Sequence, residues 1–196
     1  MKLLRIFFAA ALAWLPSNTF SAAIAVGSGP DSSFFLIESP NVGQRLYEVS
    51  YTHDSENPFD GFFLFESLLN ADPELDAIVN NFGTEEAPNI FLDTITFNSV
   101  SESNDFSSGL FWAHWVAGGQ VGQTQSLGGP VDSFLDVPDQ EWTFGSGVSA
   151  PFRFIEPGSY DAFTFDSDSN PSFVIPEPSS LALLLPSGLL LLRRRR

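Results

Sequence analysis

The sequence predicts a mainly β fold, an antiparallel β-sandwich or jelly roll with one short helix. Short segments alternate apolar and polar residues with a period of two, as half-buried strands do. Gly, Pro, Asn and Asp separate these segments at short intervals. Residues 24–175 also hold 18 phenylalanines and three tryptophans, which is enough material for a hydrophobic core. These residues suit a single domain of about 150 residues.

The predicted strands follow one another along the chain with turn residues between them. Arg45 to Thr52 alternates most clearly, and Ile90 to Val100 is rich in β-branched and aromatic residues. Residues 24–33 are predicted to be a flexible lead-in, and residues 118–130 a glycine-rich loop. The predicted strands are 34–38, 45–52, 61–65, 90–100, 110–116, 131–137, 141–144, 152–155 and 160–166.

One helix is predicted to begin after Asp72. Aspartate is a favoured N-cap, and Pro73 would occupy the first helical position, where its missing N–H costs nothing. The residues that follow have helical spacing and end in a glycine suited to the C-terminal cap. They are Leu75, Ile78, Val79, Phe82 and Gly83.

The first 23 residues have the order of a secretory signal peptide. Lys2 and Arg5 precede the ten-residue apolar segment Ile6 to Leu15, and small residues follow up to Ala23. The apolar segment is too short to span a bilayer. We therefore predict export, with a signal peptide at 1–23, an exported domain at 24–175 and a separate tail at 176–196.

The tail contains three parts in a strict order. Pro176, Glu177 and Pro178 come first, then a run of twelve residues, Leu181 to Leu192, of which eight are leucine. As a helix this run would be about 18 Å long, against about 30 Å for a bilayer core. It has almost no polar face, which argues against a buried core helix. The chain ends in four basic residues that would stay on the cytoplasmic side: Arg193, Arg194, Arg195 and Arg196.

This order of tripeptide, apolar run and arginine cluster resembles the PEP-CTERM sorting signal of Gram-negative bacteria. The resemblance implies an exported protein that an exosortase in the inner membrane recognises and cleaves near the tripeptide. It also implies release to the cell surface or the extracellular matrix, often alongside exopolysaccharide. The resemblance covers about a tenth of the chain. The apolar run is shorter than expected for the family, and Pro186 interrupts it.

The exported domain is strongly acidic. Of the 24 acidic residues only Glu177 lies outside it, and of the eight basic residues only Arg45 and Arg153 lie within it, so its formal charge is −21. This charge excludes nucleic acids as partners, because phosphates are bound by Lys and Arg. The chain contains no cysteine, which excludes disulfides and thiol chemistry.

No motif for a known catalytic chemistry is present. The sequence has no Gly-x-Ser-x-Gly elbow, no His-Glu-x-x-His and no phosphate-binding loop. The two histidines are interpreted as a packing residue, His114, and a solvated loop residue, His53. A glycosidase needs only two carboxylates, and with so many acidic residues the sequence does not exclude such a pair. We predict a non-enzymatic protein.

Two sets of residues are candidates for ligand binding. Asp166, Asp168 and Asn170 alternate like the opening of a calcium loop, although a proline stands where such a loop needs glycine. Trp112, Trp142 and Tyr160 are candidates for stacking on sugar rings. Trp112 and Trp115 are three positions apart, so a regular strand would point them to opposite faces, and at most one would join such a platform.

Three functions follow from these features. The leading prediction is an exported surface or matrix protein that an exosortase processes and that associates with exopolysaccharide or biofilm. The first alternative is a carbohydrate-binding module for neutral sugars, or for acidic sugars bridged by Ca²⁺. The second alternative is a secreted enzyme that acts on glycans.

Overall fold

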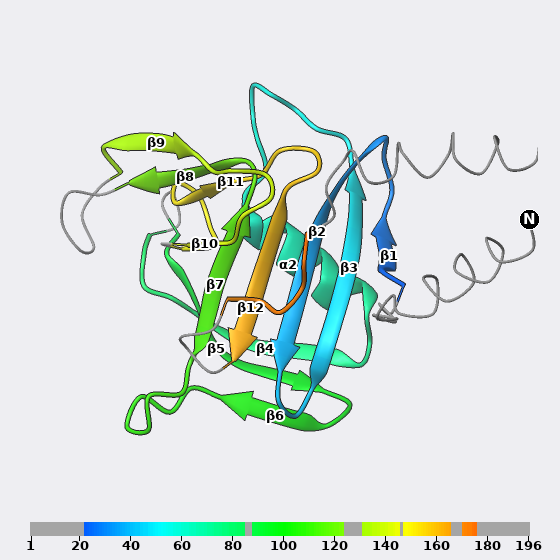
Figure 1. Ribbon diagram of the computed structural model, residues 1–196, viewed down its shortest axis with the longest axis vertical. Coiled ribbons are helices and arrows are strands. Elements are labelled where there is room, and N and C mark those ends of the chain that lie inside the picture. The colour runs from blue at the N-terminus through cyan, green and yellow to red at the C-terminus, as the bar shows by residue number, and fades with distance from the viewer. Residues whose placement is uncertain (1–21, 85–87, 124–130, 146, 166–169, 176–196) are drawn as a thin grey trace, which may run out of the picture.

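The computed structural model describes residues 22–84, 88–123, 131–145, 147–165 and 170–175. In this part of the chain the fold is mainly β with one helix, which confirms the predicted class (Figure 1). The central element is a six-stranded sheet in the order β1-β3-β2-β12-β7-β10. Its strands are β1 (Ile24–Gly27), β2 (Asp31–Ser39), β3 (Gly43–Tyr51), β7 (Trp112–Ala117), β10 (Thr143–Phe144) and β12 (Tyr160–Phe165).

Two smaller antiparallel sheets and the helix surround the central sheet. One sheet has the order β4-β5-β6, and the other has the order β11-β8-β9. The helix, α2, spans Gly61–Ala71 and lies against one face of the central sheet (Figure 1). The remaining strands are β4 (Leu75–Asn81), β5 (Ile90–Phe97), β6 (Val100–Ser103), β8 (Gln120–Gln123), β9 (Ser133–Asp136) and β11 (Arg153–Phe154).

The central sheet is mixed, which corrects the prediction of a purely antiparallel fold. β1 pairs with β3 in parallel, and β12 pairs with β2 in parallel. The β2–β3, β12–β7 and β10–β7 pairs are antiparallel. Periodicity in the sequence indicates which face a side chain occupies but not which strand lies next to it. β12, the parallel neighbour of β2, lies more than 120 residues further along the chain.

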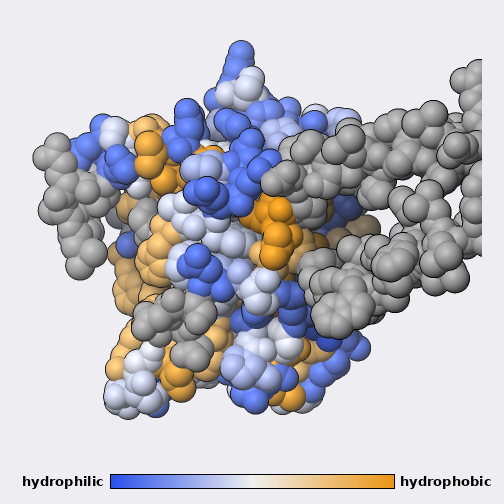
Figure 2. All heavy atoms as spheres, viewed as in Figure 1, coloured by the Kyte–Doolittle hydropathy of each residue, from blue (hydrophilic) through white to orange (hydrophobic). Residues whose placement is uncertain are grey.

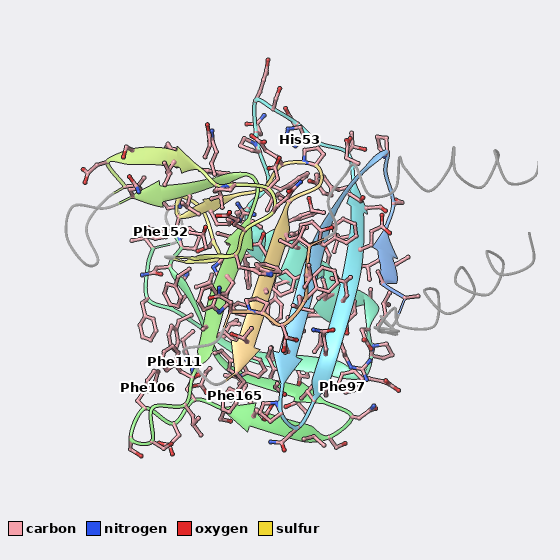
Figure 3. The ribbon with its side chains drawn as sticks, viewed as in Figure 1. His53, Phe97, Phe106, Phe111, Phe152 and Phe165 are labelled. Atoms are coloured by element: carbon pink, nitrogen blue, oxygen red, sulfur yellow. The ribbon has the colours of Figure 1, made fainter. Side chains whose placement is uncertain are left out.

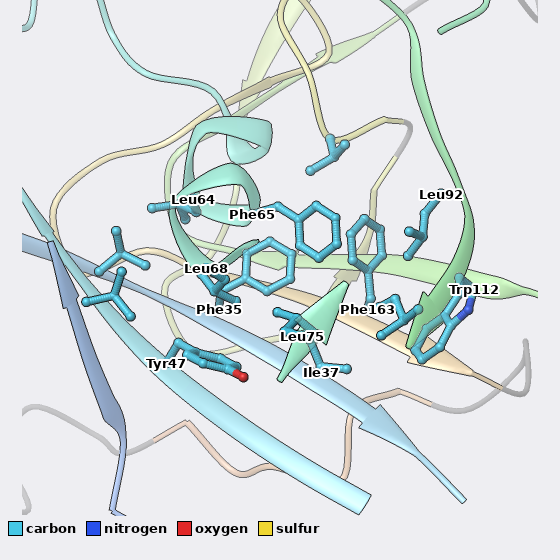
Figure 4. Packing of buried hydrophobic residues seen from close by; sticks show 14 of the residues in the cluster. Phe35, Ile37, Tyr47, Leu64, Phe65, Leu68, Leu75, Leu92, Trp112 and Phe163 are labelled. Atoms are coloured by element: carbon cyan, nitrogen blue, oxygen red, sulfur yellow. The ribbon is translucent and has the colours of Figure 1, made fainter. Parts of the chain in front are cut away.

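The main core lies between the central sheet, α2 and the β4-β5-β6 sheet (Figure 4). At its centre are Phe35 from β2, Phe65 from α2 and Phe163 from β12. Their ring centroids lie 5.2–5.4 Å apart, with tilted or edge-on geometry. Aromatic pairs favour this geometry, and each ring buries a large apolar area.

The helix α2 replaces a strand that the sequence predicts at residues 61–65. Asp60 caps it, because its Oδ1 accepts from the Phe63 N–H at 2.8 Å while its Oδ2 accepts from the Ala150 N–H at 2.8 Å. The buried residues recur at helical spacing: Gly61, Leu64, Phe65 and Leu68. The aromatic run up to Phe65 is therefore only the first half of an amphipathic helix.

The helix predicted after Asp72 is wrong, and that segment forms β4. Asp72 ends α2 instead of starting a helix: its N–H donates to the Leu68 carbonyl at 2.9 Å. Its carboxylate accepts from the Tyr47 hydroxyl at 2.7 Å and from the Glu74 N–H at 3.0 Å. β4 pairs along its whole length with β5, so its backbone groups are satisfied by a strand and not by a helix. Phe82, placed on the buried face of the predicted helix, is 72% exposed.

Two segments predicted as loops contain strands. Residues 24–33 hold β1 and the first part of β2, and the predicted loop 118–130 holds β8. Gly and Ser are poor strand formers in isolation. Here β1 is ordered by pairing with β3 and β8 by pairing with both β9 and β11.

The opposite face of the central sheet is covered in part by residues 170–175, which we call the C-terminal strap. Phe173 and Ile175 of the strap are buried against Leu36, Ala113 and Ala162 of the sheet. In Figure 1 the strap runs in front of β12 and β2, and in Figure 2 the same face shows separate hydrophobic patches among hydrophilic residues. None of the helices among the described residues has the length and apolar character required to cross a membrane.

Candidate functional site

Several residues that the sequence singles out lie outside the described part of the chain. They are most of the signal peptide (1–21), Asp166, Asp168, Pro176, Glu177, Pro178, Arg193, Arg194, Arg195 and Arg196. Asn170, the third residue of the candidate calcium loop, is exposed. Among the described residues no group of three or more His, Cys, Asp and Glu side chains is placed to hold a metal ion. Binding of Ca²⁺ at Asp166 and Asp168 stays a prediction.

Two of the three candidate sugar-stacking residues come together, and the third lies apart from them. Trp142 contacts Tyr160 edge-on, with ring centroids 6.2 Å apart. Tyr160 also stacks on Phe34, with ring centroids 4.6 Å apart and an angle of 14° between the ring planes. Trp112 belongs to the main core on the other face of the sheet, whereas Trp115 packs on the same side as Tyr160. The predicted opposite orientation of Trp112 and Trp115 is therefore confirmed.

A cavity of about 360 Å³ adjoins this aromatic group. Phe34 and Tyr160 form one part of its lining, and Ile175 of the C-terminal strap forms another. Asp139, Gln140 and Glu156 supply polar side chains at its rim, and all three residues are exposed. The cavity thus combines aromatic faces with carboxylate and amide groups.

A second group of functional interest is a buried charge cluster that the sequence did not reveal. Asp161 of β12 and Arg153 of β11 are both fully buried, and His114 of β7 is 7% exposed. Arg153 Nη2 donates to Asp161 Oδ2 at 2.7 Å, and Arg153 Nε lies 3.1 Å from both carboxylate oxygens. His114 Nε2 lies 2.9 Å from Asp161 Oδ1. We call these three residues the buried triad.

Arg153 is also a bridge between backbone segments. Its Nη1 donates to the carbonyls of Gly118 at 2.7 Å and Phe154 at 3.2 Å, and its Nη2 to the carbonyl of Tyr160 at 3.4 Å. The planar guanidinium has five donors in a fixed geometry, which suits this use. The side chain therefore holds β11, β12 and the β7–β8 turn around one carboxylate.

Asp161 is kept ionised by its neighbours. Burial alone raises the pKa of its carboxyl group, but the Arg153 charge and the hydrogen bonds from His114 and Arg153 outweigh burial and lower the pKa. The first residue of α2 also approaches closely, since a Cβ on Gly61 would collide with Asp161 Oδ1. A helix N-terminus favours a nearby negative charge. Asp161 therefore acts as an acceptor for both partners.

Beside the triad lies a cavity of about 200 Å³, with His114 in its wall. Five aromatic side chains line it, together with smaller apolar residues and Asn89. The five are Phe91, Phe111, Trp112, Phe144 and Phe163. His114 Nδ1 is buried, and none of the residues that the structure describes gives it a hydrogen-bond partner.

One sequence signal could have drawn attention to the triad. Arg153 is one of only two basic residues in a domain with 23 acidic ones, and it stands in a strand between Phe152 and Phe154. A charged residue in an apolar strand is either exposed or paired. The partner could not be chosen from so many carboxylates without the fold. His114, interpreted from sequence as a packing residue, packs in the core and also bonds to Asp161.

Comparison with known proteins yields no relative that would assign a function. No family model matches the chain, and neither a curated protein nor a solved structure is similar to it.

Proposed function

We propose that the protein is an exported, non-enzymatic surface or extracellular-matrix protein. In this proposal a signal peptide directs export, and an exosortase in the inner membrane processes the chain at Pro176, Glu177 and Pro178. The released product is an acidic, sandwich-like β domain associated with exopolysaccharide or biofilm. The tail crosses or enters the membrane only until it is processed.

The observation that carries the proposal is the position of the C-terminal strap. Phe173 and Ile175, directly before the tripeptide, are buried against the central sheet. The Ser172 N–H donates to Glu38 at 2.9 Å, and Trp142 Nε1 donates to the Phe173 carbonyl at 2.9 Å. The described domain is thus packed up to Ile175. Cleavage at the next residues would leave its core intact, as a sorting tail requires.

The charge of the domain supports the same proposal. Arg153 is fully buried, and the Arg45 guanidinium carbon lies 3.2 Å from the centre of the Phe97 ring. These are the only two basic side chains between residues 24 and 175. The domain therefore presents a mainly anionic surface, which favours solubility outside the cell and opposes adsorption to anionic lipids.

We expect alanines in place of Pro176, Glu177 and Pro178 to stop processing. The unprocessed protein would then accumulate in the membrane fraction with its tail attached. Cell fractionation and intact-mass measurement of the product test this expectation. The matched control replaces Glu156 and Pro157, an exposed Glu-Pro pair inside the domain, and should leave processing unchanged. Normal release of the triple-alanine variant would refute the sorting proposal.

Carbohydrate binding is the second candidate function, and the 360 Å³ cavity favours it. A sugar ring presents an apolar face and several hydroxyl groups, which matches an aromatic wall next to carboxylate and amide acceptors. The acidic rim, with Asp139 and Glu156, selects neutral sugars over anionic ones. Ile175, the residue before the proposed sorting tail, forms part of the wall of this cavity.

Truncating Glu156 to alanine should weaken binding of a neutral glucan by about fivefold or more, because a hydroxyl acceptor is lost. The side chain is exposed, so the fold should be unaffected. Titration with cello-oligosaccharides, monitored by tryptophan fluorescence, measures the change. Glu66→Ala removes an exposed carboxylate on α2 and serves as the control. Absence of binding by the unmodified protein would refute this second function and leave the sorting proposal untouched, whereas glycan turnover would favour a glycan-active enzyme.

A further inference from the structure

We propose that the 200 Å³ cavity beside His114 is a binding site for a small, neutral, single-ring aromatic molecule that carries a hydroxyl group. The ring would lie among the aromatic side chains of the cavity, and the hydroxyl would donate to His114 Nδ1. This proposal is independent of the sorting tail and of the carbohydrate candidate. It rests on the cavity, on the unpaired nitrogen and on the aromatic surface around the cavity.

The buried triad fixes the imidazole of His114. The ionised carboxylate of Asp161 can only accept hydrogen bonds, so the nitrogen at 2.9 Å, Nε2, must carry a proton. Arg153 holds this carboxylate through two of its nitrogens and holds neighbouring backbone carbonyls as well. The ring is also in contact with Phe163, with centroids 5.5 Å apart. The ring orientation is therefore set by Asp161 at Nε2 and by the contact with Phe163.

This arrangement leaves Nδ1 as a buried acceptor in the neutral imidazole. Nδ1 is shielded from bulk water and has no hydrogen-bond partner within the described part of the chain. Buried polar atoms in folded proteins nearly always have partners, and an exception requires an explanation. Among the described residues neither the backbone nor a side chain supplies the donor, so we infer that a bound molecule does.

The backbone of Gly145 lies against the imidazole of His114, on the side of Nδ1. A Cβ added to Gly145 would collide first with Nδ1, before any other atom. Gly145 and His114 both line the cavity. A side chain at position 145 would therefore displace the imidazole and fill part of the cavity next to Nδ1.

Aromatic side chains lead from the protein surface to the cavity. Phe82, Phe91, Phe106 and Phe111 form a row in which successive ring centroids lie 6.0–6.2 Å apart. Phe91 and Phe111 line the cavity, while Phe82 and Phe106 are 72% and 65% exposed. Phe106 and Phe111 are seen together at the edge of the molecule in Figure 3. On an otherwise acidic surface this row offers an apolar approach to the cavity.

The cavity's size and chemistry define the ligand class. About 200 Å³ holds one substituted ring and is too small to enclose a polymer or a peptide. The lining is mainly apolar, so the ligand must be mainly apolar, and it needs one donor for Nδ1. Anionic ligands are disfavoured by the charge of −21 on the domain and by the lone pair of Nδ1. Phenol is the simplest probe that meets these conditions, and anisole is nearly the same shape without the donor.

The test is an NMR titration of the ¹⁵N-histidine-labelled full chain with phenol and with anisole. Only His53 and His114 contribute signals, so His53 serves as an internal reference. We expect saturating phenol to shift the His114 Nδ1 resonance, because a new hydrogen bond forms there, while the His53 signals stay in place. Anisole should leave the Nδ1 resonance near its ligand-free position.

Two phenylalanine variants separate binding in the cavity from general adsorption. Phe144→Ala removes an aromatic wall of the cavity and should weaken phenol binding by about tenfold or more. Phe134→Ala on β9 should leave the affinity within about twofold. Both side chains are roughly half exposed, at 56% and 51%, so both variants are expected to fold. An unmoved Nδ1 resonance at saturating phenol, an equal shift with anisole, or equal losses in the two variants would overturn the proposal.

Discussion

Replacing Arg153 by methionine is expected to lower the free energy of unfolding by about 3–5 kcal/mol. The variant would leave the fully buried Asp161 carboxylate without its counter-charge, and the carbonyls of Gly118 and Phe154 without a donor. Removing one partner of a buried ion pair costs more than the pair itself contributes, because an unpaired charge remains in the core. Urea denaturation followed by tryptophan fluorescence measures the change.

The other basic residue of the domain is the matched control. Arg45 is half-buried and lies over the Phe97 ring without an ion pair among the described residues, so Arg45→Met should cost only about 1 kcal/mol. Arg153→Lys keeps the charge but not the planar set of donors, and it should fall between the two methionine variants. Equal effects at positions 45 and 153 would contradict a special role for the buried triad.

The pH dependence of the Arg153→Met variant provides a further check. In the unmodified protein the pKa of Asp161 is below its ordinary value of 3.8. The ionised carboxylate therefore stabilises the fold at pH values above 3.8. This stabilisation is lost as the pH falls through the lower pKa that Asp161 has in the folded protein. Without Arg153, burial raises the pKa of Asp161, and the fold gains relative stability when the carboxyl group is protonated. The difference in stability between the two proteins should therefore be largest near pH 7 and shrink towards pH 4. A difference that stays constant over this range would show that the cost does not come from the charge of Asp161.

Truncating Phe65 to alanine is expected to destabilise the fold by about 3–5 kcal/mol. The side chain is fully buried on α2 and contacts the rings of Phe35 and Phe163 at 5.4 and 5.2 Å. Its removal would leave a large cavity where the helix meets the central sheet. Thermal and chemical unfolding of the variant test this expectation.

Phe82→Ala is the control that separates the observed fold from the one the sequence predicted. In the predicted helix after Asp72, Phe82 belongs to the buried face, and its loss would also be severe. In the structure it follows β4 and is 72% exposed, so the variant should lose no more than about 1 kcal/mol. A large loss at Phe82 together with a small loss at Phe65 would contradict the placement of α2.

The two aspartates near α2 explain why this region could not be predicted. Asp60 and Asp72 are both good N-caps, and each is followed by apolar residues. The choice depends on contacts remote in sequence: Asp60 also binds the Ala150 N–H, and Asp72 also binds the Tyr47 hydroxyl. With these partners Asp60 begins the helix and Asp72 closes it. β5 then supplies the pairing that makes residues 75–81 a strand.

The residue types of the candidate sites could be predicted from the sequence, but their partners in space could not. The sequence identified Trp142 and Tyr160 as candidate stacking residues of a β protein. It could not show whether Trp112 lies on the same face of the sheet as these two residues. Asp161 shows the limit most clearly, because it is one of 23 carboxylates in the domain and has no distinguishing neighbour in the sequence.

The sequence by itself determined the mainly β class, the acidity of the domain and the opposite orientation of Trp112 and Trp115. These properties depend on composition and on a period of two residues, which are local. Only the tertiary structure decided the parallel pairing of β12 with β2, the position of the helix and the burial of Arg153 with Asp161 and His114. Each of these depends on which distant segment supplies a hydrogen bond or a counter-charge, and a buried polar group takes whichever partner the fold brings within reach.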